Sequence, residues 1–179
     1  MNSFFDLLVT QLKDLYSAEN QLLVALPHLL DNAECTALAS ALLEHMAETE
    51  DHLDRLDSIS SLLGVRLAGH ECKAMRGLIR EGAERLEQSY ATPQLRDVMI
   101  VALVQRIEHY EIAAYGNAIA LADYLDLQEV SALLRETIDE EATSDRTLTA
   151  LCQSQLFKDG EPRYPSRETI SEIRHFERR

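Results

Sequence analysis

Glutamates recur at helical spacing among apolar residues in separate stretches of this sequence. Glu19 stands between Leu15 and Leu22, at steps of four and three residues, so it shares their face of a helix. The other glutamates on or beside such apolar stripes are Glu48, Glu108, Glu111 and Glu141. Ionised carboxylates buried together without partners are strongly destabilising. Two divalent or trivalent cations would neutralise them, so the pattern predicts a carboxylate-rich site for two metal ions.

Histidines near these glutamates widen the candidate ligand set. His52 follows Glu48 by four residues, so both side chains face the same way, and we take His52 as a sixth candidate ligand. Oxygen-rich ligation with one or two imidazoles suits iron or manganese, with zinc as a further option. Four more residues could join the site or only surround it: His45, Asp51, His109 and Asp145. For any single position, a solvated surface glutamate remains the simpler interpretation.

Four long helices must position these side chains. The apolar periodicity predicts helices that start near Ser3, Glu34, Thr92 and Asp126. Ser3 and Thr92 are expected helix caps, and Asp126 with Glu129 has the pattern of a capping box. One glutamate per helix lies about 14 to 16 residues after these starts, near mid-height of a helix of about 45 Å. Side chains at mid-height meet in one layer whether a helix runs up or down.

The connections fix how the four helices are joined. Short turns separate the first pair and the second pair, whereas residues 65–92 form a long connection that is expected to contain a shorter helix. One long crossover is the ferritin-like way to connect four helices. We therefore predict an all-α, ferritin-like four-helix bundle over residues 1–156. A polar tail that could hold a short helix follows at residues 157–179.

Composition excludes several classes of partner. The net charge of −14 disfavours nucleic acid and anionic membranes. The three cysteines form no C-x-x-C pair, which favours a reducing, cytoplasmic location. No run of about 18 apolar residues occurs, and the start of the chain leads directly into an amphipathic segment. We expect neither a membrane span nor a signal peptide.

Four runs of sequence resemble the YciE/YciF family of ferritin-like proteins, and the similarity extends over roughly residues 4–152. The runs are residues 11–23, 72–79, 106–116 and 139–145. The resemblance implies a rubrerythrin-like bundle, a homodimer, a di-metal centre and an association with stress responses. Glu108 and Glu111 resemble the Glu-x-x-Glu pair on the third bundle helix of rubrerythrin. Glu19, Glu48 and Glu141 match the single glutamates of the other helices.

One departure from the ferritin-like pattern concerns histidine. Di-iron sites of this class carry Glu-x-x-His on two helices, whereas this sequence has Asp51 and Ser144 at the corresponding positions. His52 could substitute from one residue further on.

Two hypotheses follow. In the first, a di-metal centre, expected to be di-iron, acts on oxygen, peroxide or iron under stress, as an oxidase or peroxidase would. Glu19 and Glu141 would then be terminal ligands, Glu48 and Glu108 bridges, and Glu111 an additional ligand. In the second, the bundle is a non-catalytic structural or interaction protein with a vestigial or stabilising metal site.

Overall fold

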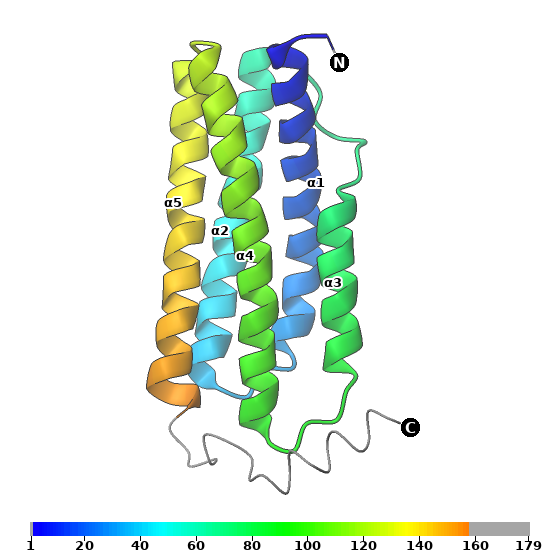
Figure 1. Ribbon diagram of the computed structural model, residues 1–179, viewed down its shortest axis with the longest axis vertical. Helices are drawn as coiled ribbons and strands as arrows, with labels where there is room; N and C mark the ends of the chain where they lie inside the picture. Colours follow the sequence, from blue (N-terminus) through cyan, green and yellow to red (C-terminus); the bar gives the residue numbers. More distant parts are fainter. Residues whose placement is uncertain (1, 158–179) are drawn as a thin grey trace, which may run out of the picture.

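The computed structural model describes residues 2–157, and in them four long helices form an antiparallel bundle (Figure 1). The bundle helices are α1 (Phe4–Leu30), α2 (Thr36–Leu63), α4 (Pro93–Tyr124) and α5 (Gln128–Leu151). A shorter helix, α3 (Lys73–Leu86), lies outside the bundle against α1 and α4. After α5 comes a single π-helical turn, Cys152–Leu156. The predicted all-α bundle with one long, helix-containing crossover is confirmed.

Capping residues that can be recognised in the sequence start or end several of the helices. The Ser3 hydroxyl accepts a hydrogen bond of 3.0 Å from the Asp6 amide at the start of α1, and Thr92 accepts one of 3.3 Å from Leu95 at the start of α4. Gly64 ends α2 with φ 63°, a left-handed conformation that glycine adopts without steric cost.

Two predicted helix starts need correction. The Asp126–Glu129 capping box does not form: Asp126 has φ 56° and α5 begins at Gln128 without a side-chain cap. Asp126 instead helps to end α4, because its amide donates to the Asp123 carbonyl. Likewise α2 begins at Thr36, two residues after Glu34, because Asp97 accepts hydrogen bonds from the amides of Glu34 and Cys35.

The interior of the bundle is divided into three levels. One apolar cluster is centred on Leu8, Leu12 and Leu56. The other is centred on Leu26, Leu42 and Val104. Buried polar side chains from α1, α2, α4 and α5 occupy the level between them.

Within the described part of the chain, no helix is long and apolar enough to cross a membrane. The predicted tail, apart from Phe157, lies outside the described residues.

Candidate metal centre

Four glutamates meet in the polar level, as their helical spacing predicts. The side chains of Glu19, Glu108 and Glu111 are fully buried, and that of Glu141 is 1% exposed. They come from α1, α4 and α5, and each is flanked along its helix by residues of the two apolar clusters. The helices therefore hold carboxylates where apolar side chains would ordinarily stand.

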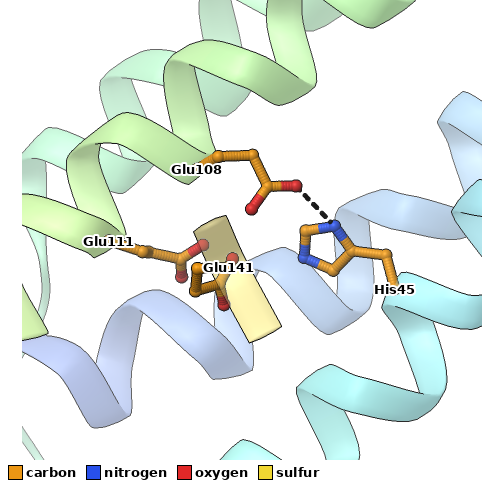
Figure 2. A group of neighbouring side chains, drawn as sticks. All are labelled: His45, Glu108, Glu111 and Glu141. Atoms are coloured by element: carbon orange, nitrogen blue, oxygen red, sulfur yellow. Dashed lines mark ion pairs between the residues drawn. The ribbon is translucent and has the colours of Figure 1, made fainter. Parts of the chain in front are cut away.

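The first group of candidate ligands consists of His45, Glu108, Glu111 and Glu141. One donor atom from each residue can be chosen so that all lie within 4.8 Å of one another. Figure 2 shows the two α4 glutamates and Glu141 facing the His45 ring. The Nδ1 atom of His45 lies 2.9 Å from Oε1 of Glu108.

The second group consists of Glu19, His52 and Glu141, which meet the same distance criterion. The Nδ1 atom of His52 lies 3.1 Å from Oε1 of Glu141 and 3.4 Å from Oε1 of Glu19. Glu141 belongs to both groups, so one carboxylate side chain is common to two sets of donors that could each hold a metal ion. Glu141 is therefore a further candidate bridge beside Glu48 and Glu108.

Unpaired polar atoms indicate that the residues fit metal ions. In the described chain, the buried side-chain nitrogen and oxygen atoms that lack a hydrogen-bond partner all belong to His45, His52, Glu19, Glu108, Glu111 and Glu141. Native proteins rarely leave such atoms unsatisfied. Coordination of cations by carboxylate oxygens and imidazole nitrogens would satisfy them.

The pKa shifts of the buried glutamates follow from the shortage of positive charge in this layer. Burial, reinforced by the neighbouring carboxylates, raises the pKa of Glu111 and of Glu141 well above the ordinary value. Burial also opposes the charge on Glu108, but the adjacent Glu141 and His45 side chains and the Ser144 hydroxyl outweigh it and lower the Glu108 pKa. Without metal, protons neutralise part of the layer. Metal binding should therefore release protons.

These pKa shifts predict a pH dependence in the metal-free protein. Because the folded pKa of Glu111 lies above its unfolded value, the folded state keeps a proton that the unfolded state releases as pH rises past about 4.5. The contribution of Glu111 to stability therefore falls from that pH upward. Thermal melts of metal-free wild type and Glu111→Gln should show the variant gaining on wild type between about pH 4 and pH 8. A difference that stays constant over this range would contradict the assignment.

A chain of contacts that the sequence analysis missed supports His52. Its Nε2 atom lies 3.0 Å from Oε2 of Glu140. The Arg55 guanidinium donates two hydrogen bonds, of 2.5 and 2.8 Å, to the same carboxylate. Burial opposes a charge on His52, but Glu19 and Glu140 outweigh it and raise the pKa of the ring. With Nε2 directed at Glu140, the Nδ1 atom is left facing the second group of ligands.

Arg55→Met is expected to weaken metal binding at the second position about 10- to 100-fold, because Glu140 would lose its anchor and His52 its fixed orientation. Isothermal titration calorimetry with a divalent metal measures the change in the dissociation constant. Arg135→Met is the matched control, since Arg135 also pairs with a carboxylate, that of Asp123, but lies 56% exposed at the end of the bundle. Equal affinities for Arg55→Met and wild type would exclude this role.

The remaining candidates lie around the two groups. Glu48 is half buried and outside both, close enough to His45 and His52 for their charges to act on it. Asp51 and His109 are exposed.

Asp145 accepts a hydrogen bond of 2.8 Å from Gln105. Ser144, at a position where related sites carry histidine, donates to Glu108 at 2.7 Å. His45, which the sequence left open as a ligand or a neighbour of the site, lies within the first group.

Comparison with known proteins decides the family. Residues 3–159 match the family described as "Domain of unknown function (DUF892)". The chain belongs to the DUF892 family. It is 35% identical over 162 residues to protein YciF of Escherichia coli strain K12, covering 90% of this chain and 97% of YciF. The predicted resemblance to the YciE/YciF family is thereby confirmed.

Solved structures agree with the DUF892 assignment. The crystal structure of the E. coli stress protein YciF superposes with a TM-score of 0.84 at 35% identity, covering 89% of this chain and all of that one. YcfI from Rhodopseudomonas palustris, described as a candidate structural protein, gives 0.80 at 36% identity over 83% and 94% of the two chains. A two-domain Anabaena variabilis protein with a ferritin-like domain gives 0.62 at 14% identity, over 92% of this chain and 41% of that one. This last match supports the ferritin-like fold alone.

Proposed function

We propose that this DUF892 protein binds two metal ions, expected to be iron, and uses them to process oxygen, peroxide or iron under stress. The observation that carries the proposal is the sharing of Glu141 by two ligand groups whose buried polar atoms lack partners. Manganese or zinc could occupy the same donors. The name of the YciF crystal structure, a stress protein, supports the physiological setting.

Each side chain would have a defined task. Glu141 would bridge the two positions, His45, Glu108 and Glu111 would complete the first, and Glu19 and His52 the second. Bound iron would supply the one-electron chemistry, as a cofactor does, while the protein fixes geometry and access. Tyr115 is fully buried and donates a hydrogen bond of 2.5 Å to Glu19, which orients that carboxylate. Glu48 stays a proposed ligand that would have to turn inward to bind.

Metal analysis of protein purified from iron-supplemented cells tests the proposal. We expect about two metal ions per chain, as in other two-metal four-helix sites. A metal-free protein whose melting temperature is unchanged by added iron or manganese would end the proposal.

A second candidate is a structural role, which the description of the R. palustris relative favours. Replacing Glu108 and Glu111 together by glutamine separates the two. An oxidase or peroxidase loses turnover with hydrogen peroxide or oxygen, whereas a structural protein keeps its role and gains stability, because the buried like charges are removed.

Partners and location complete the proposal. We expect a homodimer, with small oxidants or metal ions as substrates, and no binding to nucleic acid or membranes. The three cysteines are free in the described chain, which supports a reducing, cytoplasmic setting. Light scattering after size-exclusion chromatography measures the oligomeric state.

A further inference from the structure

A second cluster of reactive side chains lies beside the candidate metal centre. It joins Tyr110 of α4, Cys72 at the start of α3, Asp14 of α1 and His70 of the crossover. The Tyr110 hydroxyl donates a hydrogen bond to Asp14 and lies 3.0 Å from Sγ of Cys72. Sγ of Cys72 is 3.3 Å from the same Asp14 oxygen, and His70 Nε2 is 3.0 Å from the other. A phenol, a thiol and a carboxylate are thus in mutual contact.

The cluster extends from the protein interior to solvent. Cys72 is fully buried, whereas the side chains of Asp14 and His70 are 31% and 42% exposed. Tyr110 directly precedes the candidate ligand Glu111 in α4, and Cys72 belongs to the apolar cluster that contains Ile107, the neighbour of the candidate ligand Glu108. One end therefore adjoins the metal centre, and the other end reaches water.

Hydrogen bonds hold Cys72 in this place. Its amide donates to Ser17 at 2.9 Å, its carbonyl accepts from Gln21 at 3.1 Å, and its sulfur accepts from the Met75 amide at 3.4 Å. Burial raises the pKa of the Cys72 thiol, so the sulfur keeps its proton at neutral pH.

We propose that Tyr110 and Cys72 form a one-electron relay, with Asp14 as the proton acceptor, that supplies electrons to an oxidised metal centre. The metal as oxidant rests on the proposed function, whereas the chemistry of the relay itself does not.

The relay consists of two balanced steps. In the first, Tyr110 loses one electron to a one-electron oxidant and transfers its phenolic proton to the Asp14 carboxylate, which leaves a phenoxyl radical. The existing hydrogen bond supplies the acceptor, so no proton has to enter the apolar interior alone. In the second step, the Cys72 thiol transfers a hydrogen atom across the 3.0 Å contact to the phenoxyl oxygen. Tyr110 is restored, and a thiyl radical remains on Cys72.

Oxidation of the metal-free protein tests the relay without any metal. Azide radicals in aerated buffer oxidise tyrosines, after which unfolding, thiol labelling and peptide mass spectrometry measure the loss of each cysteine. We expect the fully buried Cys72 to lose its thiol before Cys35 and Cys152, both of which are partly exposed. Tyr110→Phe should protect Cys72, whereas the control Tyr124→Phe, at a side chain 70% exposed, should not.

Two outcomes would overturn the relay: earlier loss of Cys35 and Cys152, or unchanged loss of Cys72 in Tyr110→Phe. Asp14→Asn gives a second measure, because it keeps the phenol and removes the proton acceptor. It should slow the loss of Cys72, and an unchanged rate would count against the relay.

A second arm tests whether the metal centre is the oxidant. Iron-loaded protein is mixed with hydrogen peroxide, frozen within milliseconds and examined by electron paramagnetic resonance. A tyrosyl signal should appear in wild type, vanish in Tyr110→Phe and persist longer in Cys72→Ser. A signal that survives in Tyr110→Phe would overturn the link to the centre. Protein that binds no iron would refute the proposed function, while the metal-free arm still decides the relay.

Discussion

Glu141→Gln is expected to reduce bound metal from about two ions per chain to none, whereas Glu19→Gln should leave about one. Glu141 is the residue common to both ligand groups, and Glu19 belongs to one of them. Each amide keeps the size of the side chain but removes the charge that a cation requires. Metal content after dialysis against a low concentration of free iron measures the effect.

The matched control for this comparison is Glu129→Gln. Glu129 lies on the same helix as Glu141, but it is exposed in the first turn of α5, so the variant should retain wild-type metal content. Equal losses in Glu19→Gln and Glu141→Gln would mean that the two positions fill only together. Full retention in Glu141→Gln would exclude a shared carboxylate.

Saturating metal should stabilise the protein strongly. At free metal about 1,000-fold above the dissociation constant, binding to the folded state alone contributes about 4 kcal/mol per site. For a chain of this size, each occupied site raises the melting temperature by about 8–16 °C. Scanning calorimetry with and without metal measures the shift, and a chelator should reverse it.

The melting temperature of Glu111→Gln should lie above that of wild type without metal and below it with metal. Without metal, the variant should melt above wild type at neutral pH, because buried glutamine is neutral without a proton, whereas folding of wild type must keep Glu111 protonated. With metal, it should melt below wild type, because one ligand of the first position is weakened. A variant that is less stable than wild type in both states would show that Glu111 acts only through packing.

The sequence predicted what depends on periodicity along a single helix. Steps of three and four residues placed Glu19, Glu108, Glu111 and Glu141 on buried faces, and their similar distance from the helix starts placed them at one level. The cap at Ser3 and the stop at Gly64 followed from local chemistry that needs no partner helix.

What the sequence could not provide depends on how neighbouring helices are rotated and shifted against one another. His45 joins the first group, whereas Glu48 lies outside it. Yet both are on the same helix as His52, and Glu48 is nearer to His52 in sequence than His45 is. Glu140 and Arg55 support His52 from α5 and α2, and no spacing within either helix indicates that contact. The capping box that Asp126 and Glu129 predict for the start of α5 does not form. Asp126 instead belongs to the turn that ends α4, where it has a positive φ and its amide donates to the Asp123 carbonyl.

The separation of the two apolar clusters has a consequence for how the molecule opens. Without cations, the unpaired carboxylates weaken the level between Leu15 and Leu22 of α1, so we expect the two ends of the bundle to fluctuate more independently than in the metal-bound protein. Amide hydrogen exchange in the metal-free protein would then show two cooperative blocks with distinct protection. Cations that link all four helices at mid-height would merge these blocks into one, so that metal supply would govern the lifetime of the folded chain in the cell.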